Sequence, residues 1–285
     1  MSKAMSTNMP TEQQNREPKK SYRVRHPLKI RQATVSQIES LSPNLRRIVF
    51  TGADFADFVS ASFDDHVKVF FPDPQTGKLI LPQAGEAMPS DQKPIMRDYT
   101  PRYFDPQQQT LSIDFVLHQA GPACDWARQA KVGDQLAIGG PRGSMVIPMD
   151  FEGYVLIGDE TALPAIGRRL EELPRDAQVL VIAEIDCMQD QLQWDTPADT
   201  EIMWLHRMGQ SAGEADLLLQ ALKHAPLPEG DFHTWIAAET TVVRQLRQTL
   251  IADYGVNKNY IKAAGYWQRG KADSHQVIED EAEQS

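Results

Sequence analysis

Residues 154–164 read YVLIGDETALP, and their pattern indicates how the second half of the chain folds. Tyr154 to Gly158 is a short, continuous apolar segment, which is typical of a strand buried on both faces. A helix is predicted to start near Pro164, because a proline in the first helical turn loses no hydrogen bond. The stretch therefore predicts a strand, a tight turn and a helix, the repeating unit of a parallel sheet.

The same alternation continues to residue 264. Apolar strands are predicted at 179–183, 202–205, 234–238 and 260–264, and helices at 164–173, 216–223 and 242–254. Strands that alternate with helices in this way form a parallel sheet covered on both faces. We expect an α/β domain over residues 152–270, followed by an acidic flexible tail at 271–285, since a run of like charge is usually a solvated end.

The first half of the chain has shorter elements. Strands are predicted at 29–38, 45–51, 67–71, 96–100, 111–117 and 134–138, with one helix at 123–130 and a proline-containing loop at 77–94. Many short strands with a single helix predict a small antiparallel β-barrel over residues 25–151. Residues 1–24 are rich in Gln, Asn, Lys and Pro and are predicted to be a disordered tail. The fold class is thus two-domain, with a β-barrel followed by an α/β domain.

Composition restricts the possible partners. The 285 residues are 41% hydrophobic, and 39 acidic against 29 basic side chains give a net charge of −10. Proteins that bind nucleic acid or an anionic membrane surface need a basic footprint, so neither partner is expected. The polar N-terminus lacks the apolar core of a signal peptide, and two cysteines form neither a disulfide framework nor an iron–sulfur site. We expect a cytoplasmic monomer.

Two predicted helix starts are suited to phosphate groups. Thr161 is positioned to cap the helix after Gly158, and the small side chain of Ala162 lets a ligand approach the backbone. Gly121 precedes the second helix start, where unpaired amides attract an anion. An ordinary strand-to-helix turn explains the residues around Thr161 equally well, and both interpretations stay open.

Arg97 and Tyr99 are predicted to share one face of a strand. An arginine binds phosphate bidentately, and a neighbouring tyrosine ring packs on a flat aromatic group. Taken alone, an Arg-x-Tyr pair on a strand is usually a surface pair. Its position in a barrel that precedes an α/β domain favours a nucleotide site.

Seven motifs in order resemble the siderophore-interacting protein family, the ferric-siderophore reductases of the ferredoxin–NADP reductase-like superfamily. They are DDHVKVFFP (64–72), RDYTPR (97–102), DFVLH (114–118), GPA with WA (121–123 and 126–127), GGPRG (139–143), GDETALPA (158–165) and AGYW (264–267). Together they cover most of the ordered chain. Seven ordered matches are far more specific than a lone glycine loop.

The resemblance implies FAD in the barrel domain and NADPH or NADH on the α/β domain. The residues it places around FAD are Arg97, Tyr99, Thr100, Asp114, Val116, His118, Gly121, Ala123, Cys124 and Trp267. Cys124 stands where the family often has a small hydroxyl residue, and a thiol is the weaker donor. The residues implied for the nicotinamide donor are Thr161, Ala162, Pro164 and Glu239.

The resemblance further implies a ferric siderophore as the electron acceptor. Many such chelates are anionic, so an acidic protein needs local positive charge to attract one. We expect Lys68, Arg142 and Lys262 to bind the siderophore, with Arg269 as a fourth candidate. The alternative is that these are solvated surface cations.

The implied reaction needs no catalytic acid, base or nucleophile, because FAD itself converts a hydride into two single electrons. No protein-bound metal is expected, since His66 and His118 lack a third ligand at metal spacing. A reductase with a ferredoxin partner and a non-enzymatic siderophore-binding module are the alternatives. The choice between NADPH and NADH stays open, with Arg168, Arg169 and Arg207 as candidate partners for a 2′-phosphate.

Overall fold

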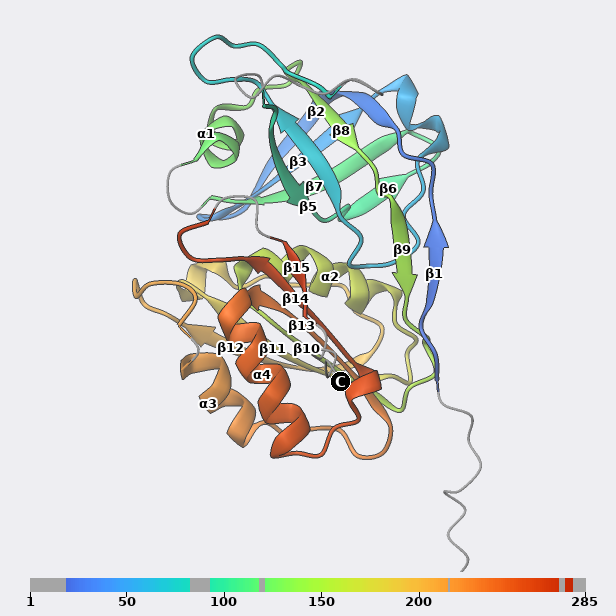
Figure 1. The fold of residues 1–285 in the computed structure, drawn as a ribbon, viewed down its shortest axis with the longest axis vertical. Helices are drawn as coiled ribbons and strands as arrows, with labels where there is room; N and C mark the ends of the chain where they lie inside the picture. The colour runs from blue at the N-terminus through green and yellow to red at the C-terminus, as the bar shows by residue number, and fades with distance from the viewer. Residues whose placement is uncertain (1–18, 83–92, 118–120, 215, 272–274, 279–285) are drawn as a thin grey trace, which may run out of the picture.

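The computed structural model describes residues 19–82, 93–117, 121–214, 216–271 and 275–278. An antiparallel N-terminal sheet and a mostly parallel C-terminal sheet lie one above the other (Figure 1). The predicted fold class is confirmed, with the qualification that the N-terminal sheet is a half-barrel. Its edge strands, β5 (Ile95–Tyr99) and β6 (Tyr103–Asp105), are not hydrogen-bonded to each other.

The N-terminal sheet has seven strands in the order β5-β4-β8-β2-β3-β7-β6. Its other strands are β2 (Ile30–Ser42), β3 (Leu45–Thr51), β4 (Val67–Phe71), β7 (Thr110–Val116) and β8 (Gln135–Gly139), and η1 (Ala53–Asp57) follows β3. Helix α1 (Pro122–Gln129) contacts β4, β5 and β7, so it covers the opening between the two ends of the sheet. Trp126 of this helix stacks on Phe50 with ring centroids 6.3 Å apart. The apolar faces of the strands and of α1 thus form one core.

A two-stranded ribbon joins the two halves of the molecule. Strand β1 (Tyr22–Arg25) pairs antiparallel with β9 (Gly143–Val146), and the ribbon runs down one side of the molecule (Figure 1). Residues 22–24 were expected to belong to a disordered tail, and the structure corrects this. The pattern gave no strand signal because three of the four β1 residues are exposed, so no apolar alternation is visible.

The C-terminal sheet has the strand order β12-β11-β10-β13-β14-β15, and every pairing is parallel except that of β15. The strands are β10 (Gly153–Gly158), β11 (Gln178–Ile185), β12 (Asp199–His206), β13 (Phe232–Glu239), β14 (Ile261–Trp267) and β15 (Gln276–Val277). The helices are η2 (Glu160–Ala162), α2 (Leu163–Glu172), η3 (Met188–Asp190), α3 (Asp216–His224), α4 (Thr240–Ala252) and η4 (Lys258–Tyr260). Strand β15 lies within the segment that was expected to be a flexible tail.

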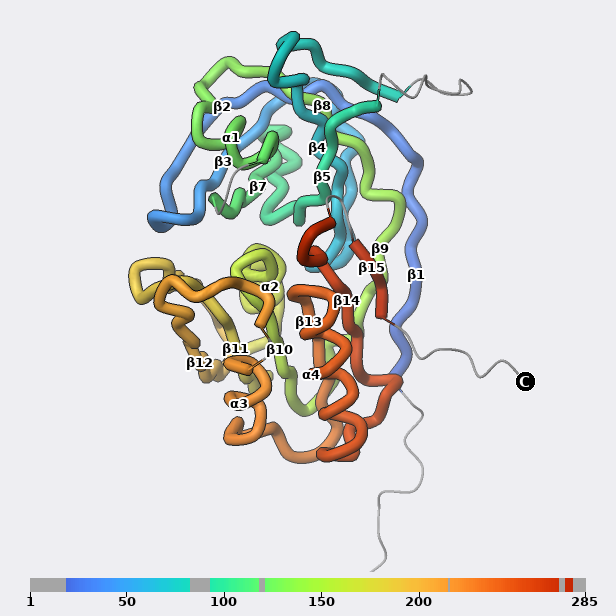
Figure 2. Tube along the Cα trace, turned by 60° about the vertical axis from the view of Figure 1, so that its left-hand side comes forward, coloured from blue at the N-terminus to red at the C-terminus, as the bar shows by residue number. Residues whose placement is uncertain are grey.

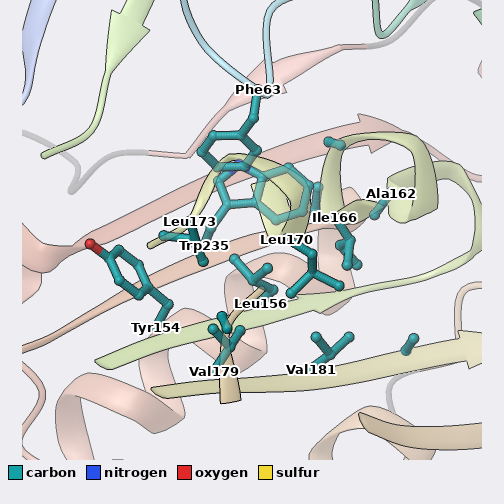
Figure 3. Packing of buried hydrophobic residues seen from close by; sticks show 14 of the residues in the cluster. Phe63, Tyr154, Leu156, Ala162, Ile166, Leu170, Leu173, Val179, Val181 and Trp235 are labelled. Atoms are coloured by element: carbon teal, nitrogen blue, oxygen red, sulfur yellow. The ribbon is translucent and has the colours of Figure 1, made fainter. Parts of the chain in front are cut away.

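Both faces of the parallel sheet are covered, as the apolar strands predicted. Helices α3 and α4 pack on one face through residues such as Leu218 and Leu246. On the other face, α2 supplies Ile166 and Leu170, and the N-terminal half contributes Phe63. Phe63 lies over Trp235 with ring centroids 5.4 Å apart (Figure 3). The two halves therefore share a core.

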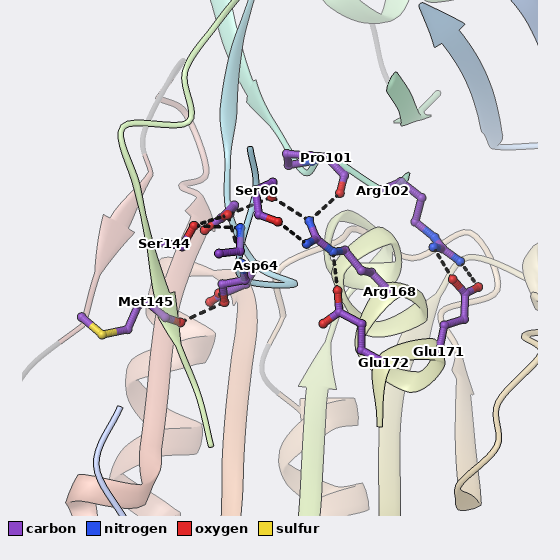
Figure 4. A network of polar contacts seen from close by, with 12 residues as sticks. Ser60, Asp64, Pro101, Arg102, Ser144, Met145, Arg168, Glu171 and Glu172 are labelled. Carbon is purple, nitrogen blue, oxygen red and sulfur yellow. Dashed lines mark hydrogen bonds and ion pairs between the residues drawn. The ribbon is translucent and has the colours of Figure 1, made fainter. Parts of the chain in front are cut away.

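Polar side chains connect the two domains (Figure 4). Arg168 of α2 donates to the hydroxyl of Ser60 at 2.8 Å and to the carbonyl of Pro101 at 2.9 Å. Arg102 forms a bidentate ion pair with Glu171. Arg168 and Glu171, which are neighbours on one face of α2, thus both bind the N-terminal domain. Within the described ranges, no helix is long and apolar enough to cross a membrane.

Candidate functional site: a cleft between the two domains

A cleft of about 910 Å³ lies between the half-barrel and the carboxyl ends of the parallel strands. Its walls come from β5, the start of α1, the turn after β10, the ends of β11 and β12, and the segment that follows β14. The sheet order reverses between β10 and β13, and ligands of open α/β sheets bind at such a reversal. The volume is within the range of cofactor-binding pockets.

Arg97 and Tyr99 of β5, and Thr100 directly after it, line the wall of the cleft. Among the described residues, the guanidinium of Arg97 has one hydrogen-bond partner, the carbonyl of Met96 at 2.7 Å. Its other donors are therefore available to an anionic ligand. The ring of Tyr99 packs on that of Phe115, with ring centroids 4.4 Å apart. Burial raises the pKa of the Tyr99 hydroxyl.

Asp114 and Val116 of β7 also line the cleft, and His118 lies outside the described residues. The carboxylate of Asp114 accepts two hydrogen bonds from Arg47, at 2.7 and 2.8 Å. Asp114 is thus held in place by an ion pair on its own sheet. The thiol of Cys124 donates to the carbonyl of Val116 at 3.3 Å, so its hydrogen bond is made within the protein. The backbone amide of Cys124 is then the group that remains for a ligand.

The start of helix α1 fits a pyrophosphate group. Gly121, Ala123 and Cys124 line the cleft, and the first amides of a helix have no partner within the helix. A Cβ atom added to Gly121 would meet no described atom within 4 Å, so open space faces the backbone. Open space, unpaired amides and a nearby arginine are together the features that a bound dinucleotide phosphate requires.

Replacing Gly121 by valine is expected to fill this space without disturbing the fold. The φ angle of Gly121 is 164°, an extended conformation that valine adopts readily. We expect the dissociation constant for FAD to rise at least about tenfold, a loss of about 1.4 kcal/mol, while thermal unfolding stays close to that of the wild type. Equilibrium titration of FAD with each protein measures the first quantity. An unchanged affinity would show that no phosphate lies at Gly121.

The turn after β10 is built differently from the prediction. Thr161 and Pro164 line the cleft, but Ala162 is fully buried beneath it. The cap of η2 is Asp159, whose carboxylate accepts hydrogen bonds from the amide and hydroxyl of Thr161. Gly158 is required by packing, since a Cβ there would lie 2.3 Å from that of Ala162. Thr161 is therefore held by the cap and does not supply it.

Glu239 is also placed differently. Its buried carboxylate accepts from the amides of Thr241 and Val242 and so caps helix α4. It is absent from the described lining of the cleft. Trp267 does line the cleft, and its indole N–H donates to Asp159 at 2.7 Å. This hydrogen bond fixes the tryptophan ring at the entrance to the turn after β10.

A buried group of charges at the ends of β11 and β12 was not predicted. Arg207 forms a bidentate pair with Glu160, at 2.5 and 2.6 Å, and a further bond to Glu184 at 3.3 Å. Burial, with help from Asp159, raises the pKa of Glu184 to about 7. Burial and Glu160 raise the pKa of Asp159 to about 6. The signal in the sequence was Glu184 itself, a carboxylate inside the apolar strand 178–185.

This group makes stability depend on pH. The pKa of Glu184 is higher in the folded protein than in the unfolded chain, so its contribution is most favourable at low pH and is lost as the pH rises toward about 7. We expect Glu184→Gln to gain roughly 2–3 kcal/mol of unfolding free energy relative to the wild type between pH 5 and pH 8. Urea unfolding at both pH values measures this difference. The exposed Glu229→Gln is the matched control, and a parallel gain there would contradict the assignment.

The candidate partners of a 2′-phosphate are largely engaged by the protein. Arg168 is bonded to Ser60 and Pro101, as described above. Arg169 is buried with its guanidinium 4.9 Å from the ring centres of Phe63 and Tyr154. Both guanidinium groups of α2 are therefore engaged in contacts within the protein. Arg207 does line the cleft, although two carboxylates already neutralise its charge.

The three cations predicted to bind the acceptor lie around residues 64–68. Lys68 forms an ion pair with Asp98 at 2.9 Å, and Asp98 lines the cleft. Lys262 contacts both oxygens of Asp64, at 2.7 and 2.9 Å. Arg142 is exposed and lies two residues after Gly140. A Cβ atom added to Gly140 would lie 3.9 Å from the carbonyl oxygen of His66, so this turn is close to residue 66. None of the three is among the described residues that line the cleft, whereas Arg269 is.

Two family models match the chain and cover both domains. Residues 34–145 match the siderophore-interacting FAD-binding domain, and residues 151–270 match the siderophore-interacting protein domain. The chain belongs to the siderophore-interacting protein family. The prediction of an FAD-binding first domain is thereby confirmed at the level of the family.

Curated relatives extend over most of the chain. The NADPH-dependent ferric-chelate reductase of Escherichia coli is 34% identical over 89% of this chain and 98% of its own length. The ferric vibriobactin reductase of Vibrio cholerae is 34% identical, with 85% of this chain and 92% of the relative covered. Both names describe enzymes that reduce chelated iron.

Solved structures of family members share the whole fold. A siderophore utilization protein from T. fusca is 38% identical, with a TM-score of 0.83 over 90% of this chain and 98% of that one. The siderophore-interacting protein SipS from Aeromonas hydrophila is 32% identical, with a TM-score of 0.71 over 85% and 93%. The fold of both domains is thus shared with these two proteins.

Proposed function

We propose that this chain is an FAD-containing, NADPH-dependent reductase of ferric siderophores. The observation that carries the proposal is the cleft between the two domains. The start of α1 and Arg97 line one side of it, and the reversal of the strand order lies on the other. Reductases of chelated iron with 34% identity over most of the chain support the reaction type. When bound, FAD supplies the conversion of a two-electron donor into single-electron steps.

The residues of the chain act by binding and orienting. Arg97 and the amides at the start of α1 hold the FAD phosphates, and Thr161 and Pro164 position the nicotinamide donor beside Trp267. Lys68, Arg142 and Lys262 attract the anionic chelate to the segment 64–68. Two of these cations are neutralised by Asp98 and Asp64, and Arg269 lies 4.0 Å from Glu214, so we expect the exposed Arg142 to add the larger share of the attraction. No side chain is required as acid, base or nucleophile.

The expected compartment is the cytoplasm. Both cysteines are free thiols in the structure, which supports a reducing environment. The donor is expected to be NADPH, since the name of the Escherichia coli relative includes it.

The test is anaerobic turnover of the FAD-loaded protein with NADPH and a panel of ferric catecholates and hydroxamates. We expect oxidation of one NADPH for every two Fe(II) ions trapped by a ferrous-specific chelator. FAD-loaded protein that reduces none of the chelates with NADPH or NADH would contradict the proposal. Turnover only with a reduced ferredoxin would assign the donor to a protein partner instead.

A further inference from the structure

The strand order gives the cleft two different ends. Strands β12, β11 and β10 lie on one side of the reversal, and β14 and β15 lie on the other (Figure 2). The first end presents Thr161, Asp186 and Arg207, the residues beside the proposed nucleotide site. The second end presents Tyr266 and His275 from the C-terminal segment. A donor that occupies the first end leaves the second end to the acceptor.

Two histidines meet at the second end. His66 directly precedes β4, and His275 directly precedes β15, so each half of the molecule supplies one ring. Their ring centroids are 4.7 Å apart, with 35° between the ring planes, and both residues line the cleft. The ring centroid of Tyr266 lies 5.6 Å from that of His275. The shared core and the polar contacts between the domains hold this pair together.

Two carboxylates lie near the imidazole pair. Asp98 of β5 lines the cleft together with the two rings, and Asp64 lies two residues before His66. The two carboxylates add negative potential next to the rings, although each also has a lysine partner. His66 is exposed, so an ion can reach the pair from solvent.

We propose that His66 and His275 supply two ligands to a divalent first-row transition-metal ion, the Fe(II) product of the reaction, while oxygen atoms of the departing chelate or of water complete its coordination. This inference rests on the proposed reductase function. After an electron has reduced Fe(III) to Fe(II) in the chelate, hard oxygen donors hold the ion less tightly, and imidazole nitrogen suits Fe(II). The step is a ligand exchange, in which Fe–O bonds break and Fe–N bonds form without further electron transfer.

A competing group of metal-ligand side chains lies at the opposite end of the cleft. Asp186, Cys187 and Asp190 have ligand atoms within 4.8 Å of one another. The carboxylate of Asp190 already accepts hydrogen bonds from Ser42 and Asn44, at 2.8 and 2.9 Å. We therefore assign this group to the contact between the domains. It provides a control site for the experiment.

The test is calorimetric titration of the oxidised, FAD-loaded protein with Co(II), a redox-stable substitute for Fe(II). We expect His66→Ala and His275→Ala each to weaken Co(II) binding at least about tenfold, as loss of a metal ligand does. His224→Ala, which removes an exposed histidine at the end of α3, and Asp186→Asn should keep the wild-type affinity. Flavin content and circular dichroism of each variant verify the fold.

Each result decides the assignment. The assignment would be overturned if the wild type did not bind Co(II), or if either histidine variant bound Co(II) as tightly as the wild type does. Loss of binding only in Asp186→Asn would also overturn it. NADPH oxidation with chelated iron is measured on the same preparations. A protein that binds Co(II) through the histidines but reduces no chelate would refute the reductase proposal alone, and an active protein without the metal site would refute only this inference.

Discussion

Replacing Lys262 by methionine is expected to lower the free energy of unfolding by about 3 kcal/mol, since removal of one partner leaves a buried charge unpaired. The side chain of Asp64 is 5% exposed, and Lys262 contacts both of its oxygens. The remaining donors are the indole N–H of Trp235 at 2.9 Å and the hydroxyl of Ser62 at 2.8 Å. Two neutral donors compensate for a buried carboxylate only in part. Chemical unfolding at neutral pH measures the loss.

The pH dependence identifies the ion pair as the cause. Burial opposes ionisation of Asp64, but Lys262, together with the hydrogen bonds from Ser62 and Trp235, outweighs it, and the pKa of the carboxyl group is lowered. The ionised Asp64 adds to the free energy of unfolding at pH values above the pKa that it has in the unfolded chain, about 4. This contribution is lost as the pH falls through the lower pKa that Asp64 has in the folded protein. The difference between wild type and variant should therefore shrink on acidification below about pH 4.

Lys68→Met is the matched control for Lys262→Met. Its ion pair with Asp98 is more accessible, with side chains 33% and 16% exposed, so we expect a loss of at most about 1 kcal/mol. Equal losses in the two variants would contradict a special role for the buried pair. If Lys262→Met weakens chelate binding under conditions where it stays folded, Lys262 contributes to acceptor binding as well.

Arg97→Ala is expected to weaken FAD binding by 10- to 100-fold, because a hydrogen bond to a charged group contributes about 1.5–3 kcal/mol. Arg97 faces the cleft beside the start of α1, and a described carbonyl engages only one of its nitrogens. Because the side chain of Arg97 lies on the cleft wall and makes one hydrogen bond to a described residue, its loss should change the free energy of unfolding by no more than about 0.5 kcal/mol. Flavin fluorescence during titration measures the affinity.

Arg175→Ala controls for the removal of a positive charge. Arg175 is exposed in the turn between α2 and β11, outside the described lining of the cleft. We expect wild-type affinity for FAD from this variant. If both variants bind FAD equally well, the flavin phosphates lie elsewhere and the proposed orientation of the cofactor is wrong.

Much of the fold followed from periodicity. The apolar run 154–158 and its successors predicted the parallel strands, because strands covered on both faces need apolar side chains at every position. The order of motifs then led to the family and to the FAD-binding domain. Helix α4 begins two residues before the predicted start. Its N-cap is Glu239, and glutamate is not one of the usual capping residues.

Local periodicity and short motifs were enough to predict most strands and helices, their order and the cleft residues Arg97, Tyr99 and Gly121, but not β1, β6, β9 or β15. The partners of the charged side chains followed only from the packing of the two domains. Lys262 pairs with Asp64, Arg168 with Ser60, and His66 meets His275 across long stretches of chain. The physical reason is that alternation along a strand fixes which face a side chain occupies, whereas the segment that crosses that face is chosen by packing of the two domains.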